Sequence, residues 1–380
     1  MVQNKRSEYI YVYIVKIIAA LLVSWGHLIS TSTWQNESVR GVITHIEGTS
    51  LLPSDTHVLW KVEAFFYGLL HVEAAVIGVV LFFLMSGFFL PRLQEKHNVP
   101  SQMPRLLISR MKRIYPVTIV CTIVVGLIAY LLQGIKFRAI DYISTALVIP
   151  TITRAQATMG VLWYLMVLMF VYLLLSIIPY ITLSNLTGIY ALLYVMVLIP
   201  KMLGQVPEGW IFTNIEYVAK FCGIPLLGAA MYFIRQRKSY FERLTAFLWF
   251  FSATFLLLKL DSLLYGTKHT YTNIWTYICS FGIIVLAIMV DKAIAQSANV
   301  ISLLRNIEKY LFHFYLVHVG VGLTTIFYLR HFNINSYICV LAAYIVSAVV
   351  TVVTYHFSRS LVVMASKMKK YSICAANRGE

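Results

Sequence analysis

Apolar residues in this chain come in runs of about twenty, and such runs recur from the first residues to the last. About twenty apolar residues are enough for one helix to cross the hydrocarbon core of a bilayer. Hydrophobic residues make up 59% of the 380 residues and charged residues only 12%, far below the share of about 25% in soluble domains. Most apolar side chains must therefore face lipid or other membrane helices, which indicates a polytopic membrane protein.

Ten segments meet this length criterion and predict an all-α bundle of about ten transmembrane helices in one integral membrane domain, residues 1–380. They cover residues 8–30, 74–93, 115–133, 160–179, 184–201, 216–234, 243–261, 272–291, 310–329 and 334–358. Segments 57–73 and 140–150 are shorter, and we expect interfacial or re-entrant helices there. The first run lacks a small-residue cleavage site and further spans follow it, which argues against a cleaved signal peptide.

The formal net charge of +16 has an explanation in membrane topology. If the N-terminus is cytoplasmic, the inner segments hold 20 Lys and Arg residues and the outer segments hold 8. Because cytoplasmic loops are enriched in these residues, we expect both termini in the cytoplasm, with residues 359–380 as a basic tail. The largest outer loops are then 31–73 and 134–159. Anionic membrane lipid at the cytoplasmic surface adds to this preference, and we expect no nucleic acid partner.

Cysteine usage gives no sign of a disulfide framework or a metal site. Four of the five cysteines lie inside apolar segments, and none forms a C-x-x-C pair. A buried thiol in such a segment behaves as a small hydrophobic group. We therefore expect no metal and no bound cofactor from this residue class.

Two ionisable residues lie within the first span, where such groups are rare and often functional. Lys16 and His27 are eleven residues apart, so a helix places them within about 20° of the same face and about 16 Å apart along its axis. A histidine exchanges protons near neutral pH, which suits acid–base catalysis. A structural reading, with a hydrogen-bonded His27 and a Lys16 that snorkels to the surface, is equally consistent with the spacing.

Two further motifs lie at the second and third spans. Residues 77–90 read I-G-V-V-L-F-F-L-M-S-G-F-F-L, in which glycines permit close helix contact and Ser86 can form a hydrogen bond; by itself this favours helix packing. Arg110 and Arg113 are i, i+3 neighbours before Pro116, and paired guanidinium groups bind phosphates. Without other signals, an ordinary positive-inside cluster is the favoured explanation of this pair.

The fourth and ninth spans add aromatic and polar residues. Trp163, Tyr164 and Leu165 open the fourth span, where an interfacial aromatic belt is the simplest reading. Tyr315 and His318 lie near the middle of the ninth span, which suggests a polar cavity.

In this order the motifs resemble acyltransferase family 3, the integral membrane O-acyltransferases that modify cell-surface and exported glycans. The matching pieces are the basic residue, ten residues and histidine from Lys16 to His27; G-V-x-L-F-F-x-x-S-G-F at 78–88; R-x-x-R-x-x-P at 110–116; W-Y-L at 163–165; and Y-L-x-H at 315–318. Three departures occur: Val80 stands where many members have Asp, Leu311 and Phe312 stand where many have Ser-Tyr, and Lys16 replaces the commoner Arg.

The resemblance implies transfer of an acetyl or other short acyl group from cytoplasmic acyl-coenzyme A, the co-substrate, to a hydroxyl of a glycan or glycolipid at a bacterial inner membrane. It assigns Arg110 and Arg113 to the donor phosphates and His27 to the general base. Lys16 would contact the donor or balance local charge, and the remaining candidates would line the passage. These candidates are Ser86, Trp163, Tyr315 and His318.

Two other function classes fit a bundle of this kind. A secondary transporter or flippase of a lipid-linked saccharide suits the number of spans, but such proteins often contain inverted repeats, and none is visible. A structural subunit leaves the Lys16–His27 stripe without a role. Binding of acyl-coenzyme A separates the enzyme from both alternatives.

Overall fold

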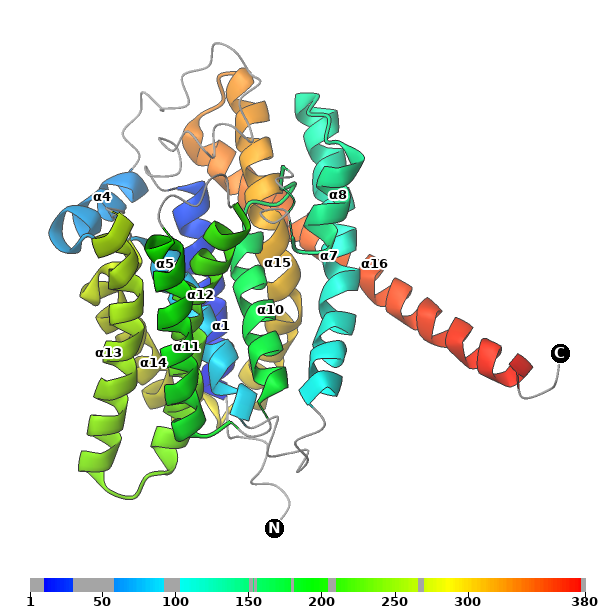
Figure 1. The fold of residues 1–380 in the computed structure, drawn as a ribbon. Helices are drawn as coiled ribbons and strands as arrows, with labels where there is room; N and C mark the ends of the chain where they lie inside the picture. Colours follow the sequence, from blue (N-terminus) through cyan, green and yellow to red (C-terminus); the bar gives the residue numbers. More distant parts are fainter. Residues whose placement is uncertain are drawn as a thin grey trace. The chain divides into compact units, whose positions relative to one another are not determined.

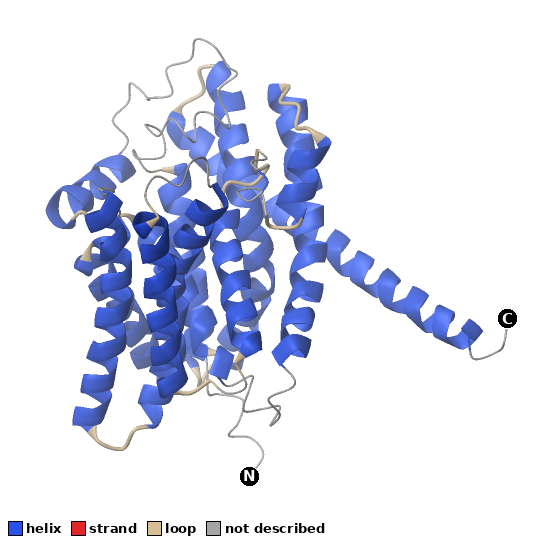
Figure 2. Cartoon of the chain, viewed as in Figure 1, coloured by secondary structure: helices blue, strands red, loops and turns tan. Residues whose placement is uncertain are grey.

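The fold was obtained as a computed structural model, drawn in Figure 1 and coloured by secondary structure in Figure 2. It describes residues 10–29, 58–91, 103–149, 153, 156–178, 181–203, 210–265 and 270–376. Within these ranges the chain forms helices, turns and short connections, and contains no strand. The predicted all-α class is therefore confirmed.

Twelve α-helices and one 3₁₀ turn follow one another along the described part of the chain. They are α1 (Ile10–Leu28), α4 (Val58–Leu70), α5 (Ala74–Phe88), α7 (Met103–Gln133), α8 (Ala139–Ala146), α10 (Leu162–Ile177), α11 (Leu183–Met202), α12 (Trp210–Gln236), α13 (Tyr240–Tyr265), η3 (Thr270–Thr272), α14 (Ile274–Ile294), α15 (Ala298–His331) and α16 (Ser336–Ala376).

Seven of these helices are long and apolar enough to cross a membrane, which makes the chain a multi-pass membrane protein. They are Ile10–Leu28, Leu107–Gln133, Ile215–Gln236, Tyr240–Leu264, Ile274–Asp291, Ala298–His331 and Ser336–Met364. Three shorter apolar helices coincide with the other predicted segments: Ala74–Phe88, Leu162–Leu175 and Leu183–Ile199. That all ten cross the membrane, and that both termini are cytoplasmic, stay predictions.

The shorter predicted segments are also helical. Helices α4 and α8 lie within the two segments expected to be interfacial or re-entrant, and α4 exposes Phe65 and Leu69 by more than 60%. Helix α16 continues to Ala376, so the predicted basic tail begins as helix. Residues 31–57 of the predicted outer loop and residues 377–380 of the tail lie outside the described residues.

The chain divides into two compact units, which we describe separately. Unit 1 comprises Met1–Gln35, Thr56–Ile108 and Trp163–Leu311, and unit 2 comprises Asn36–Asp55, Ser109–Leu162 and Phe312–Glu380. Helices α7 and α15 each run from one unit into the other.

Helix α12 forms the interior of unit 1. Of its candidate span, 78% is buried, compared with 24% for α13 and 28% for α14. The outer faces of α13 and α14 expose large apolar side chains such as Leu256 and Met289, as expected for lipid contact. Glycines bring α5 and α12 together: a Cβ at Gly87 would collide with the backbone of Pro225, and one at Gly228 with the backbone of Leu84. Such close backbone approach is typical of packed membrane helices.

The first turn of α1 is held by α14. The backbone N–H of Tyr11 donates to Asp291 Oδ1 at 2.8 Å. The first N–H groups of a helix have no partner within it, and a carboxylate there also interacts favourably with the helix dipole. This contact joins the start of α1 to the last turns of α14, because Asp291 lies three residues before that helix ends.

Three helices of unit 2 contact one another in pairs. Gly320 of α15 packs directly on Val125 of α7, and the Cys121 thiol of α7 lies beside the Thr354 hydroxyl of α16. Between α15 and α16, His313 Nε2 lies 2.8 Å from the hydroxyl oxygen of Ser358. Since only residues 332–335 connect α15 to α16, these two helices form an antiparallel hairpin.

A buried carboxylate organises the α8 region of unit 2. Asp141 is 2% exposed and accepts hydrogen bonds from the backbone N–H groups of Arg138 and Gln156, at 2.8 and 2.9 Å, and from the Arg138 guanidinium. Burial by itself raises the pKa of Asp141, but the hydrogen bonds and the Arg138 charge outweigh it, so the pKa lies below its usual value.

Candidate active site

Helix α1 carries both ionisable residues predicted as catalytic. Lys16 and His27 are half-buried on one continuous helix in unit 1. Lys16 Nζ lies 2.7 Å from Glu308 Oε1, and the two side chains are 32% and 30% exposed. Lys16, which has no acidic partner on α1 itself, therefore forms an ion pair with Glu308 of α15.

Helix α5 packs on the same part of α1. A Cβ at Gly26 would overlap Ala75, and one at Gly78 would collide with the backbone of α1 at Ala19. The two helices run antiparallel, because the later residue of α1 contacts the earlier residue of α5. Ser86 lies eleven residues after Ala75 on α5, and Val15 lies eleven residues before Gly26 on α1. Because the helices run antiparallel, Ser86 is at the height of Val15 and its neighbour Lys16 along the helix axes.

Ser86 is joined to the start of α10. Its hydroxyl lies 3.0 Å from the phenol oxygen of Tyr164, which is buried. Eleven residues separate Ala75 from Ser86, so both lie within about 20° of one another around α5. Ser86 therefore lies on the side of α5 that packs against α1. The motif at residues 77–90 thus supplies a hydrogen-bonding hydroxyl as well as glycines for helix packing.

Trp163 lies in an aromatic cluster, which we define as Trp163, Phe83, Tyr217, Phe221 and Tyr271. The Trp163 ring centroid lies 5.9 Å from that of Phe83, 6.1 Å from Tyr217, 5.1 Å from Phe221 and 5.8 Å from Tyr271. These rings come from α10, α5, α12 and η3. An interfacial belt residue would face lipid, whereas Trp163 is half-buried among rings of three other elements.

Two charged residues of α12 lie beside this cluster, and the sequence analysis did not propose them as site residues. Glu216 is 7% exposed and Lys220 is 5% exposed. Lys220 Nζ lies 5.0 Å from the centre of the Tyr217 ring and 5.5 Å from that of Phe221, within cation–π range. The available signal was a Glu–Lys pair at i, i+4 inside an apolar segment, since charges buried in a membrane helix are costly.

Glu73 is a second residue that the sequence analysis did not single out. It is the N-cap of α5, two residues before the Ala75 that touches Gly26, and is half-buried. Burial raises the pKa of this carboxyl group above its usual value. The end of α1 that carries His27 thus packs beside the end of α5 that carries a carboxyl group.

The predicted phosphate-binding pair lies in unit 2. Arg110 and Arg113 are on α7, half-buried and exposed respectively, three residues apart in the first turns of its candidate span. Because α7 begins at Met103, both lie inside a regular helix that contains Pro116, and the i, i+3 spacing puts them on one face.

The two predicted residues of α15 are enclosed in unit 2. The Tyr315 hydroxyl donates to the backbone carbonyl of Val161 at 3.1 Å, and the residue is 4% exposed. His318 has no exposed surface, and its Nδ1 lies 2.8 Å from the Tyr315 carbonyl oxygen. Since a carbonyl only accepts, Nδ1 carries the proton and Nε2 is the basic nitrogen. The ring of Phe314 stacks on this imidazole at 5.6 Å.

The eight predicted site residues therefore fall into two groups of four. Unit 1 holds Lys16, His27, Ser86 and Trp163, and unit 2 holds Arg110, Arg113, Tyr315 and His318. Within unit 1, helix packing brings Ser86 level with Lys16, whereas the roles of all eight residues stay predictions.

Comparison with known proteins bears on the whole bundle. A family model described as acyltransferase domain, that of acyltransferase family 3, matches residues 9–356. No curated protein and no solved structure matches the chain. The matched segment runs from α1 into α16 and contains every predicted site residue, and the protein is therefore a member of acyltransferase family 3, a membrane acyltransferase.

Proposed function

We propose that the protein moves a short acyl group, most simply acetyl, from acyl-coenzyme A to a hydroxyl of a cell-surface or exported glycan or glycolipid at a bacterial inner membrane. The observation that carries this proposal is the arrangement of α1 and α5. One stripe of α1 presents His27 near its end and Lys16 about 16 Å further along, against the face of α5 that carries Ser86. Family membership favours this enzyme over the transporter alternative.

The transfer requires one base and one acid, and His27 serves as both in the proposed mechanism. Its imidazole accepts the proton of the acceptor hydroxyl while the hydroxyl oxygen attacks the thioester carbonyl carbon. The tetrahedral intermediate then collapses, the carbon–sulfur bond breaks, and the leaving thiolate receives the proton from the imidazolium. The products are an ester on the acceptor and free coenzyme A.

His318 is the competing base, and its surroundings favour a structural role. It has no exposed surface, it donates to a carbonyl of its own helix, and its ring is stacked on Phe314. His27 is half-buried at the end of α1. A hydroxyl must approach to hydrogen-bonding distance of the base, which a fully enclosed imidazole does not permit without rearrangement.

The aromatic cluster supports a sugar as acceptor. Ligand sites combine aromatic and apolar walls with a few placed polar groups. Trp163 and Tyr217 are half-buried and carry rings of the kind on which the C–H face of a sugar stacks. We assign the acceptor to this part of unit 1 and the donor phosphates to Arg110 and Arg113.

Matched histidine variants test the proposal. His27→Gln and His318→Gln are purified in nanodiscs at equal yield, and acyl transfer to extracted glycan is followed by mass spectrometry. We expect His27→Gln to bind acyl-coenzyme A and to form no product, because an amide does not take up a proton near pH 7. Product from His27→Gln together with none from His318→Gln would move the base to α15. A wild-type protein that binds no acyl-coenzyme A would overturn the donor assignment itself.

A further inference from the structure

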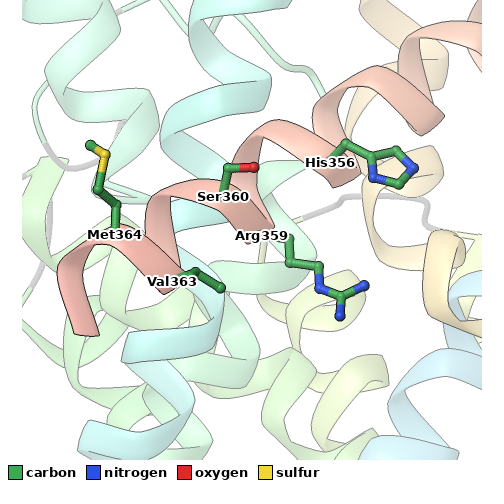
Figure 3. Close-up of a pocket in the computed structure, with 5 residues that line it drawn as sticks. All are labelled: His356, Arg359, Ser360, Val363 and Met364. Atoms are coloured by element: carbon green, nitrogen blue, oxygen red, sulfur yellow. The ribbon is translucent and has the colours of Figure 1, made fainter. Parts of the chain in front are cut away.

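Unit 2 carries further basic side chains on its last helix, apart from Arg110 and Arg113. An open surface pocket of about 430 Å³ lies along one face of α16 and is lined by five exposed residues at helical spacing: His356, Arg359, Ser360, Val363 and Met364. Figure 3 shows these side chains along two turns of α16, with the Arg359 guanidinium and the His356 imidazole extending away from the helix backbone.

The contacts within unit 2 fix which end of the unit holds this pocket. On the α15–α16 hairpin, Gly320 contacts Val125 of α7 nearer the connecting turn, and Thr354 contacts Cys121 of α7 further from it. Moving along α7 from Val125 to Cys121 therefore leads away from the hairpin turn. The N-terminal part of α7 lies at the end of unit 2 opposite to that turn.

Both basic groups lie at that same end. Arg113 precedes Cys121 by eight residues, about 12 Å along α7, and Arg110 lies one turn further. Arg359 follows Thr354 by five residues, about 7 Å along α16 in the same direction. Two helices thus bring guanidinium groups to one end of the unit, a pair from α7 and a single group from α16.

The turn that carries Arg359 is anchored on α15. The neighbouring residue, Ser358, is 4% exposed, and its hydroxyl lies 2.8 Å from Nε2 of His313. The same hydroxyl donates to the Tyr355 carbonyl at 3.0 Å, so Nε2 of His313 is the donor of the shorter contact. A site on a helix whose backbone is held in this way is better defined than one on a free end.

Coenzyme A presents phosphate at two separate places, a diphosphate and a single phosphate on the 3′ carbon of its ribose. A guanidinium pair at i, i+3 suits the diphosphate, and a single guanidinium with a hydroxyl and an imidazole beside it suits a phosphomonoester. We propose that Arg359, together with His356 and Ser360, binds the 3′-phosphate of the donor. The proposal rests on the proposed function, because it presumes that acyl-coenzyme A is the donor.

Removal of that one phosphate tests the assignment. Binding of acetyl-coenzyme A and of 3′-dephospho-acetyl-coenzyme A is measured by titration calorimetry for the full chain in nanodiscs. We expect the wild type to bind acetyl-coenzyme A tighter by about tenfold to a hundredfold, the range of one charge-assisted contact. Arg359→Ala should lose that factor for acetyl-coenzyme A and bind the dephospho donor as the wild type does. Arg359→Lys should restore part of it.

Controls separate this site from general charge and from lipid. Arg243→Ala removes the same charge at an exposed position of unit 1 and should leave both affinities unchanged. Equal loss for both donors, or no loss for either, in Arg359→Ala would refute the 3′-phosphate assignment while leaving the donor proposal intact. A loss seen only in nanodiscs with anionic lipid would assign Arg359 to a lipid head group instead. A wild type that binds neither donor would overturn the proposed function and this inference with it.

Discussion

Replacement of Gly87 by alanine tests the packing on which the unit 1 site depends. The added methyl group would run into the carbonyl oxygen, carbonyl carbon and Cα of Pro225 on α12. These are backbone atoms, so no change of rotamer relieves the overlap and the two helices must separate. Overpacking of this kind destabilises by about 1–3 kcal/mol. The gain in helix propensity of alanine over glycine, about 1 kcal/mol, offsets only part of it.

Gly282 of α14 is the matched control, because the chemical change is the same and the surroundings are not. Nothing lies within 4 Å of a Cβ built at this exposed position. Gly282→Ala should therefore retain the whole propensity gain, about 1 kcal/mol of stabilisation. The two variants are expected to differ in sign, with Gly87→Ala less stable than the wild type and Gly282→Ala equal or more stable.

The assay is thermal unfolding of both variants in the same detergent at one scan rate, followed by tryptophan fluorescence, because unfolding of such proteins is often irreversible. Gly87→Ala should also transfer acyl groups more slowly, since its neighbour Ser86 lies on the face of α5 that packs on α1. Equal melting temperatures for the two variants would show that α5 and α12 are not in close backbone contact at Gly87 and Pro225, and would refute this account of how α5 is held in unit 1.

Three further outcomes follow from single contacts. Asp141→Asn should lower the free energy of unfolding at neutral pH by about 2 kcal/mol. Because the pKa of Asp141 is depressed in the folded state, the wild type should keep its full advantage at pH values above the ordinary carboxyl pKa and lose it as the pH falls through the folded-state pKa. Melting curves of both proteins from pH 7 to 3 will check this. Asp291→Ala should lower the melting temperature by the loss of one helix cap, about 1 kcal/mol, whereas Asp291→Asn should retain most of it. Trp163→Ala should raise the KM for the glycan acceptor while leaving acyl-coenzyme A affinity unchanged; a change confined to the donor would contradict the acceptor assignment.

The positions of the membrane helices could be predicted from sequence because a bilayer imposes one length on every span. The ten predicted segments coincide with helices, and the shorter ones at α4 and α8 are also present. Helix ends were less predictable: α7 starts at Met103 and α16 extends to Ala376, because a helix that leaves the hydrocarbon continues wherever its sequence permits. Hydropathy reports the apolar part of a helix and carries no information on its length in water.

The surroundings of the site residues were not predictable in the same way. Spacing along one helix places Lys16 and His27 on one stripe, but Glu308 is 292 residues from Lys16 in sequence. The rings around Trp163 likewise come from three other elements. Such contacts depend on which helices become neighbours in the bundle. The hydropathy of a segment is the same whichever helices it packs against, so it does not predict those neighbours.

The Lys16–Glu308 pair changes how the first motif is understood. A lone ammonium group inside a bundle must either be used by a substrate or snorkel to the surface, and the sequence offered those two readings. The Glu308 carboxylate, 2.7 Å from Lys16 Nζ, balances the charge of Lys16 without a substrate and without exposure at the membrane surface. The Lys16 and Glu308 side chains are each about 30% exposed, so water reaches both of them. If a group of the donor replaces Glu308 as the partner of Lys16, the Glu308 carboxylate is therefore not left as a buried, unpaired charge. In the proposed mechanism, Lys16 holds α1 on α15 before the donor arrives and contacts the donor afterwards, so the structural and catalytic readings would describe two states of one residue.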